Sequence, residues 1–400
     1  MAETSIAASS PPDYVARLHT RIETVRETWH ACETQGLCTA FQRYDWTSAI
    51  VQHLLPAMHS DFFVIEVLDG TSLTPLMLLP LLRRRYPGYA EIEWFGLGVC
   101  DYSAPLLTKP VVFSKGQAEA AWRAVLAVLP RTDRLTISGL PEEIAPGIAN
   151  PLALLDAAGT MPEIFTSGLA ISAPPETLIA RVCKRSFAKR YEKDKRRLER
   201  IGTVSLEEAT TPEEVEAMFS ELVRLRIERF QKLGRFDLLS RPSYVDYYRD
   251  CAHQGLVDGA VRILGLRIDG EWLAVLYMLV HGGSSNGIIV AIDETREHNV
   301  SPGLLMIAKA MEWACVHDIS YFDLSIGSHG YKQHMGAQSY PLFQLDEVFT
   351  LKGRLVAVVA EAMTSLKNWL RKQPKVFSFL QATRARLRQL KASLSRGSTR

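Results

Sequence analysis

The sequence has few cysteines and no histidine pattern of the kind that binds a metal ion. Its 400 residues contain six cysteines, and no two of them form a C-x-x-C pair. Their spacing suits neither a zinc site nor a disulfide scaffold. The histidines are scattered, without H-E-x-x-H or a similar spacing. We therefore expect no metal site, and reduced, mostly buried thiols in a cytosolic protein.

Long apolar runs are also missing. The most apolar stretches, residues 73–82 and 272–280, are far shorter than the roughly 18 to 20 residues that a membrane-spanning helix needs. The N-terminal sequence MAET has neither the basic nor the apolar region of a secretory signal. No P-loop or Rossmann glycine motif occurs, and GSHG at 327–330 is not the G-x-S-x-G elbow of a hydrolase. We expect a soluble, cytoplasmic protein.

The composition is that of a globular protein whose charges are unevenly distributed. Hydrophobic residues make up 47% and charged residues 22%, which excludes a wholly disordered chain. The net charge of +2 argues, taken alone, against a dedicated nucleic-acid-binding protein. However, residues 181–200 sum to +7 and residues 362–400 to +10, while the rest of the chain sums to −15. The two basic segments are therefore candidates for contact with anionic partners.

Both halves of the chain follow the same order of expected elements: two helices, a hairpin, a third strand, a helix and a fourth strand. In the first half these are helices at 14–32 and 41–58, strands at 62–68, 73–82 and 92–95, a helix at 118–129 and a strand at 135–138. In the second half they are helices at 212–230 and 244–253, strands at 261–268, 272–280 and 288–292, a helix at 302–316 and a strand at 321–324. Each hairpin has an Asp-Gly turn, and the two turns lie 200 residues apart.

This order is similar to that of the GNAT acyltransferase core. It predicts an α+β fold with two tandem GNAT-like domains, each a mainly antiparallel mixed sheet flanked by helices, and a basic C-terminal helical tail. The expected division is a disordered start at 1–12, an N-terminal degenerate domain at 13–170, a C-terminal acyltransferase domain at 171–350, and a basic amphipathic tail at 351–400. Residues 168–175 fit a linker between the domains.

The start of the helix at 302–316 is a candidate phosphate site. Ser301 suits the N-cap, Pro302 the first helical position, and Gly303 allows a ligand to approach the backbone. Asn299, just upstream, tolerates turn geometry. The first N–H groups of the helix can bind an anion such as a pyrophosphate. An ordinary capped helix is the alternative, but the position after a third strand favours a coenzyme A site.

Residues 323–332, DLSIGSHGYK, are dense in titratable groups at the end of a strand. Acyl transfer needs a base for the attacking amine or hydroxyl and donors for the tetrahedral oxyanion. Asp323 or His329 fits the base, Tyr331 a proton donor or oxyanion stabiliser, and Lys332 a cation for a phosphate or carboxylate. Each also has a plain structural alternative, such as a cap, a surface loop residue, a half-buried aromatic or a solvated charge. The cluster is stronger evidence than any member.

The two basic segments suggest substrate and surface contacts. In 181–200, Arg185, Lys189 and Arg190 are candidate ligands of a phosphorylated or acidic acceptor, the alternative being a solvated helix face. In 362–400, apolar residues near helical spacing alternate with Lys and Arg, and no acidic residue follows Glu361. Such a tail can lie on an anionic membrane, or pack on the domain with a frayed basic end.

The stretch SPGLLMIAKAMEWACVHDISYFDLSIGSHGYKQHMG resembles the CelD-like acetyltransferases of cellulose and exopolysaccharide biosynthesis, relatives of the FemAB peptidyltransferases. The matching features are the S-P-G helix start, the strand with F-D, the following glycine and the Y-K pair, here Ser301–Gly303, Phe322–Asp323, Gly327 and Tyr331–Lys332. In the first half, Phe41 with Trp46, LLPLLRRR at 78–85 and Asp101-Tyr102-Ser103 also resemble the family. Ser328-His329 departs from the acidic residues expected after the glycine, so the base remains open.

The resemblance implies acyl transfer from an acyl-CoA, acetyl-CoA or longer, to a small-molecule or glycan-precursor acceptor of the cell envelope or an exopolysaccharide. One alternative is a FemAB-like transferase that takes an aminoacyl group from tRNA, the only reading with a nucleic-acid partner. Another is a non-catalytic scaffold of a polysaccharide synthesis complex, held at the inner membrane surface through residues 362–400.

Overall fold

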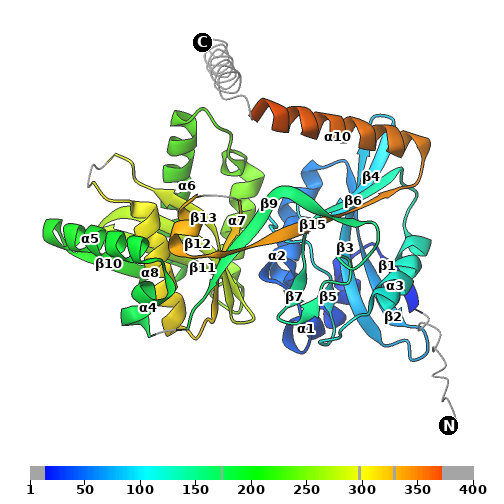
Figure 1. Cartoon of the computed structure of the whole chain (residues 1–400), viewed down its shortest axis with the longest axis horizontal. Coiled ribbons are helices and arrows are strands. Elements are labelled where there is room, and N and C mark those ends of the chain that lie inside the picture. Colours follow the sequence, from blue (N-terminus) through cyan, green and yellow to red (C-terminus); the bar gives the residue numbers. More distant parts are fainter. Residues whose placement is uncertain (1–13, 173, 296–298, 328–329, 372–400) are drawn as a thin grey trace, which may run out of the picture.

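The structure is a computed structural model that describes residues 14–172, 174–295, 299–327 and 330–371 (Figure 1). One sheet of 13 strands runs through both halves of this described part of the chain. Its order is β1-β2-β3-β4-β6-β15-β9-β14-β13-β12-β11-β10, with β5 attached to β3. Helices cover both halves, and α10 lies across the ends of β4 and β15.

The N-terminal half is built on the predicted hairpin. Its strands are β1 (Tyr14–His19), β2 (Ser60–Asp69), β3 (Pro75–Tyr86), β4 (Tyr89–Trp94), β5 (Leu106–Leu107) and β6 (Arg134–Pro141), with the small pair β7 (Glu143–Ala145) and β8 (Ile148–Ala149). Its helices are α1 (Arg26–Thr34), α2 (Tyr44–Ala49) and α3 (Lys115–Val128), with the short turns η1 (Ile22–Val25), η2 (Ala40–Gln42), η3 (Ile50–Leu54) and η4 (Leu55–Ala57). β4 and β6 pair in parallel because α3 carries the chain back between them.

The C-terminal half repeats this arrangement. Its strands are β10 (Val204–Glu208), β11 (Val261–Ile268), β12 (Glu271–His281), β13 (Ser284–Ile292) and β14 (Tyr321–Ile326). Its helices are α4 (Pro175–Val182), α5 (Arg185–Ile201), α6 (Pro212–Lys232), α7 (Pro242–Gln254), α8 (Pro302–Val316), α9 (Gly330–Met335) and α10 (Leu351–Arg371), with the turn η5 (Leu238–Ser240). β13 and β14 pair in parallel, as β4 and β6 do.

The halves exchange strands at the centre of the sheet. β9 (Ala158–Ala170) follows the N-terminal half in sequence but pairs with β14 of the C-terminal half. β15 (Gln338–Val348) follows the C-terminal half but pairs with β6 of the N-terminal half. β9 and β15 also pair with each other, so the two halves form one continuous sheet.

Both predicted hairpins are confirmed, whereas two predicted helices are not. The 14–32 helix is wrong, because Tyr14–His19 pairs as an edge strand with β2 and the chain becomes helical only from Ile22. The 41–58 helix is interrupted: α2 ends at Ala49, and a wider turn and a short 3-10 turn containing Pro56 follow. In both places, sheet pairing and proline override a helical apolar pattern.

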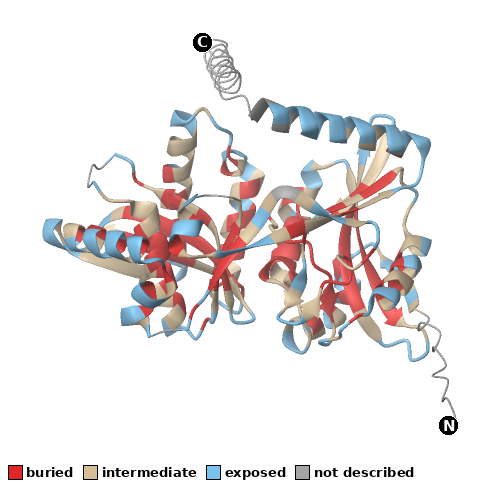
Figure 2. Cartoon of the chain, viewed as in Figure 1, coloured by how far each residue is buried: buried red, intermediate tan, exposed pale blue. Residues whose placement is uncertain are grey.

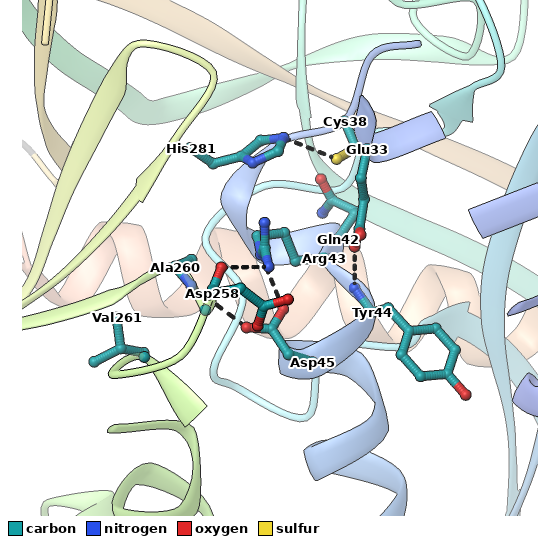
Figure 3. A network of polar contacts seen from close by, with 12 residues as sticks. Glu33, Cys38, Gln42, Arg43, Tyr44, Asp45, Asp258, Ala260, Val261 and His281 are labelled. Carbon is teal, nitrogen blue, oxygen red and sulfur yellow. Dashed lines mark hydrogen bonds and ion pairs between the residues drawn. The ribbon is translucent and has the colours of Figure 1, made fainter. Parts of the chain in front are cut away.

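A shared hydrophobic core joins the two halves. One cluster of buried residues combines α1, α2 and β2 of the N-terminal half with α6, α7 and β12 of the C-terminal half (Figure 2). Within it, the ring of Trp46 lies 5.0 Å from that of Tyr247, edge to face. Polar contacts border the cluster, since Arg43 donates to the carbonyl oxygen of Asp258 at 3.0 Å and to Asp45 (Figure 3).

The structure also describes the cysteines, the clusters of potential metal ligands and the longer helices. All six cysteines are free. In the described part of the chain, no cluster of three His, Cys, Asp or Glu side chains has metal-binding geometry. None of the described helices is both long and apolar enough to cross a membrane.

Candidate active site

Asp323 lies where the parallel strands β13 and β14 separate. Asn286 of β13 is the last residue in register with β14, and its partner there is Asp323. On the other side of β14, Asp323 faces Gly168 of β9 before the register shifts. Gly168 leaves room for a ring, because a Cβ there would lie 2.3 Å from the hydroxyl of Tyr321. Thus a buried carboxyl is placed at the fork of the sheet.

Three donors hold the Asp323 carboxyl, which is 7% exposed. The hydroxyl of Tyr102 donates to Oδ2 at 2.6 Å, and the backbone N–H of Ser325 donates to Oδ1 at 2.6 Å. Thr166 donates to Oδ1 at 3.4 Å and also contacts the Tyr102 hydroxyl. Burial raises the pKa of Asp323 to about 6, against the lowering effect of Tyr102 and Ser325. This pKa suits a base near neutral pH.

A second carboxyl, that of Asp101, interacts electrostatically with Asp323. Burial raises its pKa, while polar groups of Ser325 and Ile326 and the charge of Lys332 oppose the rise. The charge of Asp101 in turn raises the pKa of Asp323. The two carboxyls therefore disfavour simultaneous ionisation, and one of them keeps a proton more readily than an isolated aspartic acid does.

Lys332 ties the end of β14 to α9. Its ammonium donates to the carbonyl oxygen of Ser325 at 2.7 Å and to that of Ile326 at 3.1 Å, and the residue is 2% exposed. Ser325 has a positive φ of 62°, a strained conformation for a residue with a side chain. Burial lowers the pKa of Lys332, and the charges of Asp323 and Asp101 raise it. Lys332 thus fixes the backbone whose Ser325 N–H holds Asp323.

Of the other two residues predicted for catalysis, the structure describes only Tyr331. Tyr331 is half-buried against the apolar cluster beneath α8, and burial raises its pKa. His329 and its neighbour Ser328 lie outside the described residues.

The predicted phosphate site lies at the start of α8, directly after β13. Asn299 is exposed with a positive φ of 50°. The Ser301 N–H donates to Asp194 of α5 at 3.2 Å, and the N–H groups of Leu304 and Leu305 reach back to the Ser301 carbonyl oxygen. Pro302 has no N–H, and the N–H groups of Ser301, Leu304 and Leu305 are already used. The Gly303 N–H is therefore the one donor of the first turn that is left for an anion.

The three basic candidates on α5 lie in two places: Arg190 at the start of α8, and Arg185 with Lys189 in a surface groove. The Arg190 guanidinium donates to the Ser301 hydroxyl and lies 3.8 Å from Asp194, so it joins the start of α8. Arg185 and Lys189 instead line a surface groove of about 580 Å³. The groove also contains the basic residues Lys193, Arg196 and Arg200 of the same helix.

The comparison with family models identifies the domain that carries this fork. Residues 185–333 match the model described as "Acetyltransferase (GNAT) domain". The chain therefore carries a GNAT-type acyltransferase domain. The match includes α5, the start of α8, Asp323 and Lys332, and it bears out the prediction of a GNAT acyltransferase. None of the curated proteins compared with the chain matches it.

Solved structures similar to this chain share its two-half fold at low sequence identity. A FemX crystal structure aligns with a TM-score of 0.56 and 13% identity, over 81% of this chain and 96% of FemX. The C-terminal domain of a protein assigned as a lysylphosphatidylglycerol synthetase in Agrobacterium fabrum aligns at 0.51 and 12%, over 84% and 94%. A protein of unknown function from Bacteroides thetaiotaomicron aligns at 0.51 and 9%, over 84% and 100%. These matches and the GNAT domain confirm the predicted α+β fold with tandem GNAT-like halves.

The first half contributes residues that the sequence did not single out as site residues. Tyr102 comes from the loop before β5, where Gln42 donates to its carbonyl oxygen at 2.7 Å and the Phe41 ring packs edge to face at 5.5 Å. Thr166 comes from β9. The Asp101-Tyr102-Ser103 triplet was visible only as a family resemblance, since nothing in the sequence indicates that it meets a strand 220 residues later. The surroundings of Asp323 thus include residues of the N-terminal half.

Proposed function

We propose that this protein transfers an acyl group from an acyl-CoA to an amine or hydroxyl of a cell-envelope or exopolysaccharide precursor, as a CelD-like member of the GNAT superfamily. The observation that carries the proposal is the Asp323 carboxyl at the fork of β13 and β14. It is buried, has a pKa of about 6 and is held by Tyr102 from the other half.

Asp323 is the general base in this mechanism. Above its pKa it accepts a proton from the attacking amine or hydroxyl, which adds to the thioester carbonyl and expels the coenzyme A thiolate. The Tyr102 hydroxyl, whose pKa burial and the charge of Asp323 raise well above its usual value, stays protonated and orients the carboxylate. Lys332 keeps the Ser325 N–H in place and offsets the negative charge of the carboxyl pair.

The start of α8 offers the phosphates of an acyl-CoA one cation, Arg190, but few free backbone donors. Arg190 brings a cation to Ser301, and Gly303 supplies the remaining N–H of the first turn. Asp194 accepts the Ser301 N–H, as a bound anion does at a helix start. In a glycine-rich loop, several backbone N–H groups bind the phosphates. In this chain the Arg190 guanidinium takes over part of that role.

Calorimetric titration with acetyl-CoA and longer acyl-CoAs tests the proposal. We expect binding that weakens about tenfold in Arg190→Ala, on the scale of one charge-assisted contact. Arg185→Ala, on the same helix but in the groove, is the matched control and should bind normally. Asp323→Asn should retain binding yet release no coenzyme A thiol in the presence of acceptor. Absence of binding by the unaltered protein would refute the acyl-CoA proposal.

The basic groove of α5 favours a second candidate, a FemAB-like transfer of an aminoacyl group from tRNA. Five Lys and Arg side chains line it, and a row of cations is suited to a phosphate backbone. On this reading, tRNA affinity falls steeply with salt and drops in Arg185→Ala and Arg196→Ala, whereas Arg190→Ala has less effect. A tRNA affinity that is the same at low and high salt would exclude this candidate.

A further inference from the structure

The apolar side chains of α10 point away from the protein. Seven large apolar residues on this helix are at least 50% exposed: Leu351, Leu355, Val358, Val359, Met363, Leu366 and Trp369. Most are spaced by three or four residues, so they share one face of the helix. The opposite face is the one turned to the body, where Gly353 is buried and Val356, Ala357 and Ala360 are half-buried. Figure 2 shows α10 as an almost entirely exposed helix along one edge of the molecule.

Well-placed contacts fix the start of α10. Thr350 accepts a hydrogen bond from the Gly353 N–H at 3.1 Å and donates to the Asp133 carboxylate at 2.6 Å. Gly353 packs so closely that an added Cβ would lie 2.0 Å from the Asp133 carbonyl oxygen. The helix is thus held with its small residues inward and its large apolar residues outward.

This orientation is the reverse of that of an ordinary surface helix, which turns its apolar stripe to the core. A contiguous apolar face of this length indicates an interaction surface. The charges around it indicate the occupant. Lys352 and Arg354 are exposed at its start, and the chain after Glu361 contains ten Lys and Arg but no Asp or Glu.

We propose that the outward stripe of α10 inserts into an anionic membrane surface. The apolar face provides the buried area, and the cations on the helix and in the sequence after it attract anionic headgroups. A second copy of this chain is a poorer occupant, because two such segments carry the same charge and repel each other. The inference concerns an attachment surface and does not depend on the reaction proposed above.

Vesicle co-sedimentation of the full chain tests this attachment. The probes are vesicles of phosphatidylcholine alone and vesicles with roughly a third phosphatidylglycerol. We expect binding to the anionic vesicles that falls with salt, and much weaker binding to the neutral ones. Leu355→Glu and Leu366→Glu should each weaken binding at least about tenfold, since each removes a leucine that the proposed attachment buries in the membrane. Thr364→Glu adds the same charge on the same helix outside the stripe and serves as the control, with an effect of about fivefold or less.

Each other outcome would overturn the proposal. If the chain does not bind anionic vesicles, a membrane is not what the outward stripe of α10 contacts. Equal losses in Leu366→Glu and Thr364→Glu would show that charge alone, and not the apolar stripe, makes the contact. Light scattering supplies the remaining comparison: a dimer of the unaltered chain that Leu366→Glu dissociates would assign the stripe to a second copy. Circular dichroism and unchanged thermal midpoints show that the variants are folded.

Discussion

At the scale of single residues, Asp323 is held between opposing effects. Burial and the charge of Asp101 raise its pKa, while the Tyr102 hydroxyl, the Ser325 N–H and the Lys332 charge lower it. The outcome, a pKa of about 6, depends on donors from both halves of the chain. The individual donors can be removed one at a time, so their contributions are measurable.

Tyr102→Phe should move the pH dependence of the reaction. Loss of the hydroxyl removes the largest effect that lowers the pKa of Asp323, so the carboxyl ionises at higher pH. The acidic limb of kcat/KM should shift upward by about one unit, the size of one hydrogen bond to a charged group. Tyr340→Phe, which removes a hydroxyl that contacts Gln338, is the control and should leave the limb in place. An unchanged limb in Tyr102→Phe would argue that Asp323 is not the titrating base.

Asp323→Asn should stabilise the protein selectively at neutral pH. A carboxyl whose pKa is raised by folding favours the folded state most when it is protonated, and this contribution is lost as the pH rises through the folded pKa of about 6. Asparagine stays neutral throughout. At about pH 7.5 the variant should therefore gain up to about 3 kcal/mol relative to its effect at about pH 4. Urea unfolding at both pH values measures this difference, and equal effects would contradict it.

Sequence reasoning reached part of this site. Asp323 and Lys332 lie in a short segment of strand, glycines and titratable residues, which is a local pattern. Tyr102, Asp101 and Thr166 reach Asp323 only through tertiary contact between the halves. No local spacing relates them to Asp323. Likewise, the sequence suggests Lys332 as a cation for a phosphate or carboxylate, or as a solvated charge, whereas its ammonium donates to the carbonyl oxygens of Ser325 and Ile326.

At the scale of secondary structure elements, the contact between α5 and α8 places two charged side chains at the start of α8. Asp194 and Arg190 both reach Ser301 from α5. The carboxylate satisfies a backbone donor, and the guanidinium supplies a cation next to it. A pair of opposite charges on α5 therefore sets the local electrostatic environment at the start of α8.

Asp194→Asn should tighten acyl-CoA binding while slightly destabilising the start of α8. The substitution removes a negative charge beside the proposed phosphate site and frees Arg190 from an ion pair. An affinity gain of about threefold to tenfold is expected for one partly screened charge. Glu192→Gln, on the same helix but in the groove, should change the affinity little. Weaker binding in Asp194→Asn would mean that this carboxylate positions Arg190 for the ligand.

Gly353→Ala should loosen α10 without unfolding the sheet. The new methyl group would collide with the backbone of Asp133, which the strand pairing of β6 holds in place, so the helix must move. Hydrogen exchange of α10 amides should become faster, whereas exchange in β4 and β6 stays slow. Gly116→Ala in α3, where an added Cβ would meet nothing within 4 Å, is the comparison for the change in helix propensity alone.

At the scale of the whole molecule, the strand exchange makes the two halves interdependent. Leu345 of β15 is fully buried among residues of the N-terminal half, and Leu342 packs in the cluster that both halves share. Residues 158–170 contain two glycines and a proline, and the sequence analysis predicts no strand there. They become a strand only because β14 and β15 lie on both sides. The hairpins were predictable from local pattern and turn residues, but this exchange is a pairing of distant segments.

Leu345→Ala should therefore destabilise both halves together. Truncation of a fully buried leucine costs about 2 to 5 kcal/mol. Variants that keep Trp122 of the first half or Trp313 of the second as the fluorescent probe should give the same denaturation midpoint. Residues 171–350 expressed alone lack β9 and should fail to fold cooperatively, whereas residues 158–350 should regain part of the stability. Two separate midpoints would show that each half is an independent unit.

The same exchange sets an order of events during synthesis. β6 ends at Pro141, but its partner β15 starts only at Gln338. At a translation rate of about 5 to 20 residues per second, the β6 edge waits on the order of ten to forty seconds for its partner. An unpaired edge beside apolar strands is a template for aggregation. We therefore expect the nascent chain to depend on ribosome-associated chaperones until β15 has emerged.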